Sequence, residues 1–134
     1  MSIPLESNDL VNPQQMEVAV NGPDGATHLI LCTGVAELGP ITHQTFTFCV
    51  GPLLTRRQFV GVIASGALSR IQTYRDILGE DGHPELGASL VSIEANYDDV
   101  ISQVEVKAEV SSGTVLTKLA ISYHVNILAE LPAD

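Results

Sequence analysis

The chain has 134 residues, of which 45% are hydrophobic and 16% are charged, a composition typical of folded domains and not of disordered segments. Six basic residues face sixteen acidic ones, and the formal net charge of -10 argues against a large surface for nucleic-acid phosphates or anionic lipid. A chain of this length buries roughly two-thirds of the surface that it exposes when unfolded, so we expect one domain with its own core.

The chain shows no recognisable targeting or membrane segment. Its opening, MSIPLESNDL, lacks the basic and apolar regions of a signal peptide, and no run approaches the roughly 18 apolar residues of a membrane span. The two cysteines, Cys32 and Cys49, are too few for a disulfide framework. We therefore expect cytoplasmic synthesis, reduced thiols and no membrane partner.

Residues 1–15 contain two prolines and follow neither the helical nor the strand period, which predicts an extended N-terminal arm ahead of a single domain at 16–134. This arm offers few apolar side chains to offset a backbone ordering cost of about 1 kcal/mol or more per residue. We therefore expect a neighbouring subunit to order it.

Alternation of apolar and polar residues predicts six strands. They cover residues 16–20, 28–38, 41–50, 87–96, 100–110 and 115–131. Residues 21–25 are rich in turn formers and predict a hairpin loop after the first strand. Gly34 indicates a bulge or a close backbone approach within the second strand. A turn at Gly39-Pro40 would pair the second and third strands, and one register of that pairing brings Cys49 opposite Cys32.

The segment 55–79 predicts one long helix. Thr55 and Gln58 have the spacing of a capping box, and Gly79 supplies a stop signal. The residues expected to form its buried stripe are Val60, Ala64, Ala67, Ile71, Tyr74 and Leu78. Gly61 and Gly66 would each cost about 1 kcal/mol in such a helix, so we expect them to permit close packing on a sheet or on another subunit.

The predicted final strand is unusually long. Residues 115–131 would extend over about 50 Å at roughly 3.3 Å per residue, which exceeds the width expected of a domain of this size. We expect this strand to bend, to bulge, or to project beyond its own sheet, where a neighbouring subunit would complete its unpaired backbone groups.

The sequence contains no recognisable catalytic, cofactor or metal motif. The four histidines, His28, His43, His83 and His124, each lack a second ligand at metal-binding spacing. The acidic pairs at 80–81 and 98–99 do not match a calcium loop, and no nucleophile elbow, phosphate loop or C-x-x-C is present. We expect no cofactor, and we favour a non-enzymatic role over an enzymatic one.

Four of the six basic residues fall within one short stretch: Arg56, Arg57, Arg70 and Arg75. Arg56 and Arg57 would lie at the start of the predicted helix, where the helix dipole disfavours positive charge by a few tenths of a kcal/mol. Two kinds of anionic partner remain open, namely the chain's own carboxylates and those of a neighbouring subunit. The four arginines are therefore candidate subunit contacts.

These elements predict an α+β fold, mainly an antiparallel β-sandwich with one long central helix and an extended N-terminal arm. The order of arm, three strands, helix and three strands resembles that of phage tail-tube and head-tail connector proteins. This resemblance, which involves no motif, implies a structural subunit of a homo-oligomeric virion ring or tube, with copies of itself and other assembly proteins as partners. The alternative is a cytoplasmic small-ligand-binding or small enzymatic domain with a pocket between helix and sheet.

Overall fold

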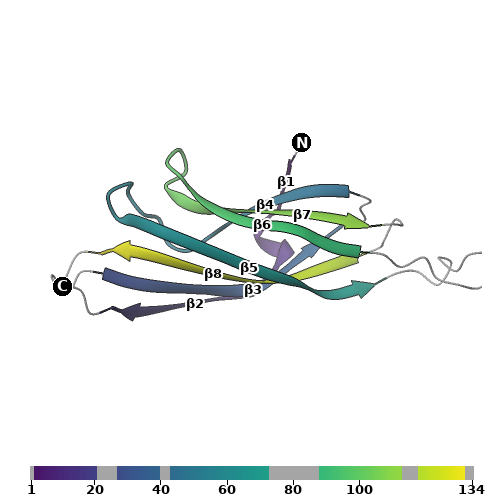
Figure 1. Ribbon diagram of the computed structural model, residues 1–134, viewed down its shortest axis with the longest axis horizontal. Helices are drawn as coiled ribbons and strands as arrows, with labels where there is room; N and C mark the ends of the chain where they lie inside the picture. The colour runs from purple at the N-terminus through teal and green to yellow at the C-terminus, as the bar shows by residue number, and fades with distance from the viewer. Residues whose placement is uncertain (1, 21–26, 40–42, 73–87, 113–117, 132–134) are drawn as a thin grey trace, which may run out of the picture.

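The structure is a computed structural model that describes residues 2–20, 27–39, 43–72, 88–112 and 118–131. Figure 1 shows two β-sheets packed face to face. In chain order the elements are β1 (Ser2–Pro4), the short 3-10 helix η1 (Ser7–Asp9), β2 (Leu10–Ala19), β3 (Thr27–Leu38), β4 (His43–Val50), β5 (Phe59–Gln72), β6 (Ala88–Asp98), β7 (Gln103–Ser112) and β8 (Lys118–Glu130). The described residues include no α-helix and no helix that would span a membrane.

Each sheet has four strands. The first sheet has the order β1-β4-β7-β6, and the second has the order β2-β3-β8-β5. Neighbouring strands are antiparallel throughout, except that β1 runs parallel to β4. The fold is therefore a β-sandwich of two mostly antiparallel sheets.

The predicted long central helix is wrong, and with it the α+β class. Its first turn nevertheless forms as expected, because the Thr55 hydroxyl accepts from the Gln58 amide at 3.3 Å and the Gln58 side chain accepts from the Thr55 amide at 2.8 Å. After this one turn the chain enters β5. Two features of β5 explain the change, since its glycines and β-branched residues disfavour a helix and favour a strand.

Two irregularities hide the strand period of β5. Its pairing with β8 shifts between Phe59 and Gly61 and again between Leu68 and Arg70. Each extra residue moves the following side chains to the opposite face, so the apolar positions no longer alternate strictly in sequence. Val60 and Ala67, expected in the buried stripe of the helix, are exposed, whereas the side chains of Ile71, Tyr74 and Leu78 lie outside the described residues.

The other strand predictions agree with the structure in position but not always in pairing. Residues 28–38 and 41–50 form β3 and β4, which belong to different sheets, so the turn expected at Gly39-Pro40 does not join paired strands. Cys32 lies between Gln15 and Val125, and Cys49 lies beside Glu105 in the other sheet. The two thiols are therefore not opposite each other, and both are free.

The final strand does not outrun its sheet. β8 lies in the middle of the second sheet and pairs with β3 on one side and β5 on the other over almost its whole length. Its backbone groups are thus used within the chain, and it offers no free edge to a neighbour. The long strand fits because β3 and β5 are comparably long.

The segment 1–15 packs on its own domain and contributes to both sheets. Residues 2–4 pair with Thr45, Phe46 and Thr47 of β4, and the amide of Leu5 donates to the carbonyl of Thr47 at 2.7 Å. The chain then crosses through η1 to the second sheet, where β2 begins at Leu10. These contacts are made by backbone pairing within the chain, and the expected contact of this segment with a neighbouring subunit stays a prediction.

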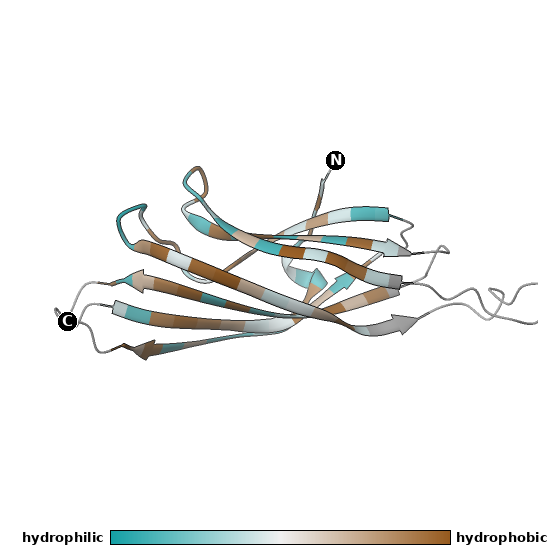
Figure 2. Cartoon of the chain, viewed as in Figure 1, coloured by the Kyte–Doolittle hydropathy of each residue, from teal (hydrophilic) through white to brown (hydrophobic). Residues whose placement is uncertain are grey.

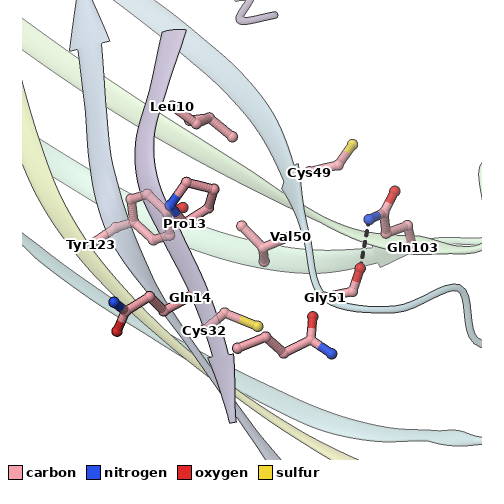
Figure 3. Close-up of a pocket in the computed structure, with 10 residues that line it drawn as sticks. Leu10, Pro13, Gln14, Cys32, Cys49, Val50, Gly51, Gln103 and Tyr123 are labelled. Atoms are coloured by element: carbon pink, nitrogen blue, oxygen red, sulfur yellow. Dashed lines mark hydrogen bonds between the residues drawn. The ribbon is translucent and has the colours of Figure 1, made fainter. Parts of the chain in front are cut away.

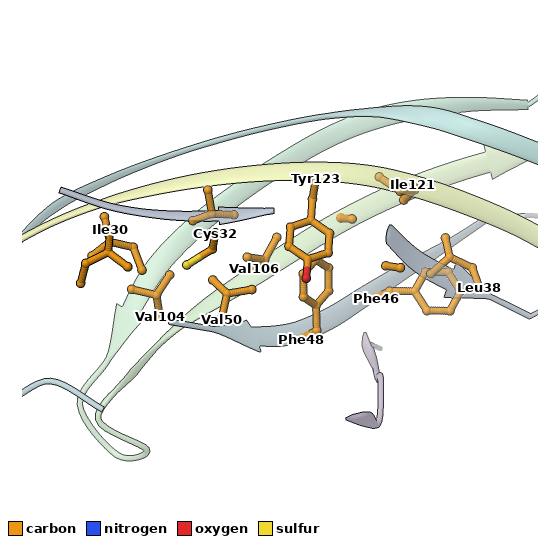
Figure 4. Packing of buried hydrophobic residues seen from close by; sticks show 14 of the residues in the cluster. Ile30, Cys32, Leu38, Phe46, Phe48, Val50, Val104, Val106, Ile121 and Tyr123 are labelled. Atoms are coloured by element: carbon orange, nitrogen blue, oxygen red, sulfur yellow. The ribbon is translucent and has the colours of Figure 1, made fainter. Parts of the chain in front are cut away.

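The core lies between the two sheets (Figure 4). Alternate residues of β3, β4, β7 and β8 point inward and are buried, among them Ile30, Phe48, Val106 and Tyr123. The rings of Phe48 and Tyr123 pack across the core with centroids 4.9 Å apart. No polar or charged residue is buried among the described residues, so the core is an apolar layer that holds the two sheets together.

One side of the sandwich is closed by β5 and β6. Phe59 and Tyr97 stack with ring centroids 5.1 Å apart, and the Tyr97 hydroxyl donates to the Leu54 carbonyl at 2.6 Å. A Cβ on Gly66 would stand 3.0 Å from Cδ1 of Ile93. Gly66 therefore permits close packing, as expected, but it does so between β5 of one sheet and β6 of the other. Neither strand pairs with the other, and each remains the last strand of its own sheet.

Candidate interaction surface

The outer faces of the two sheets differ in chemistry. The outer face of the first sheet carries charged side chains on β6 and β7, which are Glu94, Glu105, Lys107 and Glu109. Glu94 lies opposite Lys107. This is the usual composition of a face in contact with water.

The outer face of the second sheet has an uncharged centre. Its central positions on β2, β3, β8 and β5 are Gln14, Met16, Val18, Leu29, Leu31, Thr33, Leu128, Asn126, His124, Gly61, Ile63 and Ser65. The charged residues Glu37 and Glu130 lie towards opposite ends of this face. The centre of this face therefore carries no acidic or basic side chain, although the chain has sixteen acidic residues.

The edge strand β5 is the most unusual part of this sheet. It has no charged residue and no proline from Phe59 to Ser69, and hydrophobic residues follow one another along it in Figure 2. Ile63 is 73% exposed and Val60 is 50% exposed. Soluble proteins commonly protect edge strands with lysine, proline, inward-pointing charges or bulges. The two bulges of β5 lie near its ends, and none of these devices lies between Gly61 and Leu68.

The opposite edge strand, β2, is protected over only part of its length. Pro13 and a break in pairing between Val11 and Gln14 interrupt its first half, where Asn12 has a φ of 50°. From Gln14 to Ala19 the pairing with β3 is regular, and the one charged residue of this part, Glu17, lies 2.9 Å from His28 on the side away from the outer face. Met16 is 62% exposed on the outer face of this regular part.

The exposed residues of the two edges lie on one line across the sheet. Met16 pairs with Leu31, Leu31 with Asn126, and Asn126 with Ile63. Met16 and Ile63 therefore mark the two ends of a single row of side chains. Neither residue is predicted as a contact from the sequence, because Ile63 falls within the predicted helix and the faces of the strand that begins at Met16 are not assigned. The available signal is the uncharged run around Ile63.

The described part of the chain places three of the candidate arginines at the two ends of β5. Arg56 and Arg57 are exposed in the turn before β5, whereas Arg70 lies near the other end of that strand. The guanidinium of Arg56 lies 3.1 Å from a carboxylate oxygen of Asp99. Of the two kinds of anionic partner considered, Arg56 therefore has a carboxylate of its own chain. Arg75 and the side chain of Arg70 lie outside the described residues. A role of the four in subunit contacts stays a prediction.

A cavity of about 240 Å³ opens between β2 and β4, on the side opposite β5 and β6 (Figure 3). Cys32, Cys49, Gln103 and Tyr123 contribute to its wall. The Gln103 side-chain amide already donates to the Gly51 carbonyl at 2.7 Å, and burial raises the pKa of both thiols, that of Cys32 to about 11. The carboxylates of Glu105 and Asp98 raise the Cys49 pKa further, so neither sulfur is an activated nucleophile.

The three histidines that the structure describes lie apart from one another. His28 lies 2.9 Å from Glu17, and His43 lies 2.9 Å from Glu109. His124 is exposed on the outer face of the second sheet, and His83 lies outside the described residues. No group of three potential metal ligands occurs in the part of the chain that the structure describes.

Comparison of the chain with protein families, with curated proteins and with solved structures found no match.

Proposed function

We propose that this chain is a non-enzymatic structural subunit that assembles with copies of itself into a closed ring or tube. The observation that supports this best is the uncharged, exposed edge strand β5. A monomer with such an edge would be prone to uncontrolled strand pairing. Assembly would cover it in a defined way.

The second sheet supports a ring in particular because it has an unpaired edge at each end, β2 and β5. A contact that joins the two edges head to tail would cover both in every copy, and it leaves no free edge once the ring closes. The net charge of -10 favours copies that are soluble before they assemble.

We further propose a virion ring or tube as the setting, with other assembly proteins as additional partners. This part of the proposal is supported by the order of strands alone, because the described residues do not include the helix that contributed to the resemblance. The ring and its setting are separate statements, and the first does not depend on the second.

The alternative is a small-ligand-binding or small enzymatic domain. The described residues include no helix to form the pocket expected between helix and sheet, so a surface cavity would have to serve. The cavity beside Cys32, at about 240 Å³, lies below the roughly 300 to 1,000 Å³ of most ligand sites, and its Gln103 amide is already engaged by the backbone. Hollows of about 360 Å³ beside Phe48 and about 370 Å³ beside Tyr97 reach that range, but no group of three potential metal ligands occurs among the described residues. Assembly therefore accounts for more of the structure.

The test is the native mass of the purified protein at tens of micromolar, by light scattering and native mass spectrometry. We expect one closed oligomer. Ile63→Lys should lower that mass while the domain stays folded, because Ile63 is exposed and a lysine protects an edge. The matched control is Val100→Lys, which adds the same charge at an exposed apolar residue in the turn after β6. A monomeric wild-type protein would contradict the proposal.

A further inference from the structure

We infer that β5 of one copy pairs antiparallel with β2 of the next copy, with Ile63 beside Met16 of that neighbouring copy. This inference rests on the proposed function and adds to it the identity of the contact. Three features of the second sheet lead to it, namely strand direction, strand irregularity and side-chain chemistry.

The first feature is strand direction. The sheet has four strands, each antiparallel to the one beside it, so β2 and β5 run in opposite directions. When one copy is placed beside the next in the same orientation, β5 meets an antiparallel β2. The sheet then continues across the contact in its own hydrogen-bonding pattern, which is the more stable of the two kinds of pairing.

The second feature is where the two edge strands are regular. The pairing of β2 is regular from Gln14 to Ala19, and that of β5 is regular from Gly61 to Leu68. Through β3 and β8, Gln14 lies on the same row as Ser65, and Val18 lies on the same row as Gly61. The bulge-free parts of the two edge strands therefore lie on the same cross-strand rows of the sheet.

The third feature is the chemistry of the side chains at that level. The middle row ends in Ile63 on one edge and in Met16 on the other, and both side chains point to the outer face. They are exposed apolar groups, and no described strand pairs with β2 or β5 on its free side. Directly paired side chains lie roughly 5 Å apart, so pairing of the edges would bring these two into contact.

A head-to-tail contact accounts for both edges, which a twofold contact does not. Pairing β5 with β5 of a second copy would cover one edge in each copy and leave β2 exposed. Pairing β2 with β2 would leave the uncharged β5 exposed. Only contact of β5 with β2 covers both edges through a single type of interface.

Engineered cysteines test this contact. Met16→Cys and Ile63→Cys are made in separate chains that also carry Cys49→Ser, since Cys32 is buried and Cys49 is the accessible native thiol. Within one copy the two positions are three strand spacings apart, about 14 Å, whereas disulfides need Cα atoms within about 7 Å. A disulfide between them must therefore join two copies. Asn96→Cys, exposed on the first sheet, is the control.

We expect co-expressed Met16→Cys and Ile63→Cys chains to form a covalent heterodimer on mild oxidation. Each variant expressed alone, and either variant with Asn96→Cys, should stay monomeric on a denaturing gel. A covalent dimer of Ile63→Cys alone or of Met16→Cys alone would show a twofold edge contact and overturn the inference.

The native mass separates this inference from the proposed function. An oligomeric wild-type protein whose paired variants do not crosslink would overturn the β5–β2 contact and leave the structural role intact. A monomeric wild-type protein would overturn both.

Discussion

The ring of Tyr123 lies over the backbone of Gly34, its register partner on β3, and a Cβ on Gly34 would stand 2.5 Å from the tyrosine hydroxyl oxygen. Tyr123 is buried and packs against Phe48 across the core (Figure 4). The close approach expected at Gly34 is confirmed, and the pairing of β3 with β8 continues through it without a bulge. The absent side chain of Gly34 therefore makes the space for the largest buried ring of the core.

Gly34→Ala should lower the free energy of unfolding by about 1–3 kcal/mol, because the added methyl group forces the Tyr123 ring out of a packed position. Urea unfolding measures the loss. Tyr123→Phe removes the nearest atom, so Gly34→Ala should cost less in that background than in the wild type.

Gly61→Ala is the matched control, since no atom outside its chain neighbours lies within 4 Å of a Cβ at that position. We expect it to leave the free energy of unfolding unchanged or to raise it by about 0.4–1 kcal/mol, because alanine lowers the conformational entropy of the unfolded chain. Equal losses for Gly34→Ala and Gly61→Ala would mean that the cost comes from glycine flexibility and not from the tyrosine contact.

Tyr97 joins the two sheets at their closed side through its stack on Phe59 and its hydrogen bond to the Leu54 carbonyl. Tyr97→Phe keeps the ring and removes the donor, and should cost about 0.5–1.5 kcal/mol. Tyr97→Leu also removes the stack and should cost about 0.5–1.5 kcal/mol more. If Tyr97→Phe is as stable as the wild type in thermal and urea unfolding, water replaces the hydroxyl at Leu54.

Alternation was enough to locate most strands in this chain, because one face of each sheet meets an apolar core. Residues 28–38 were assigned from the sequence and form β3 at almost the same bounds. Pairing was not predictable in the same way. Nothing local to Gly39-Pro40 shows that the chain leaves one sheet for the other, so the register that would place Cys49 opposite Cys32 is wrong.

The false helix has a local cause. The reciprocal hydrogen bonds of Thr55 and Gln58 are typical of a helix start, and both are present in the structure. Here they stabilise a single turn, after which the chain continues as a strand. The bulge at Val60 then shifts the strand alternation by one residue and imitates a helical spacing. The exposed row from Met16 to Ile63 could not be predicted, because it depends on the register of four strands.

Deleting residues 1–5 should lower the free energy of unfolding by about 1–3 kcal/mol without changing the native mass. The deletion removes the pairing of β1 with β4 and the partly buried Leu5, which packs on the core, but it leaves residues 14–18 in place. Calorimetry and light scattering measure the two effects. Ile3→Ser, which changes an exposed side chain of the same segment, is the control. If the deletion variant is fully folded but has a lower native mass than the wild type, residues 1–5 contribute to the subunit contact instead.

The thiol of Cys32 should make stability depend on alkaline pH, because burial raises its pKa from 9.0 to about 11 in the folded chain. Between these values the unfolded chain has lost the proton and the folded chain still holds it. The folded state thus binds more protons, and the free energy of unfolding falls as pH rises.

The measurement is the difference in unfolding free energy between the wild type and Cys32→Ala as a function of pH. Groups that do not interact with Cys32 titrate alike in both proteins and cancel. Tyr123 cancels only in part, because burial raises its pKa in both proteins but the Cys32 thiolate raises it further in the wild type alone. We expect the difference to be constant below pH 9 and to shift by about 2–3 kcal/mol against the wild type as pH approaches 11. A difference that stays constant through this range would mean that water reaches the sulfur in the folded chain, and the cavity beside Cys32 would then be its route.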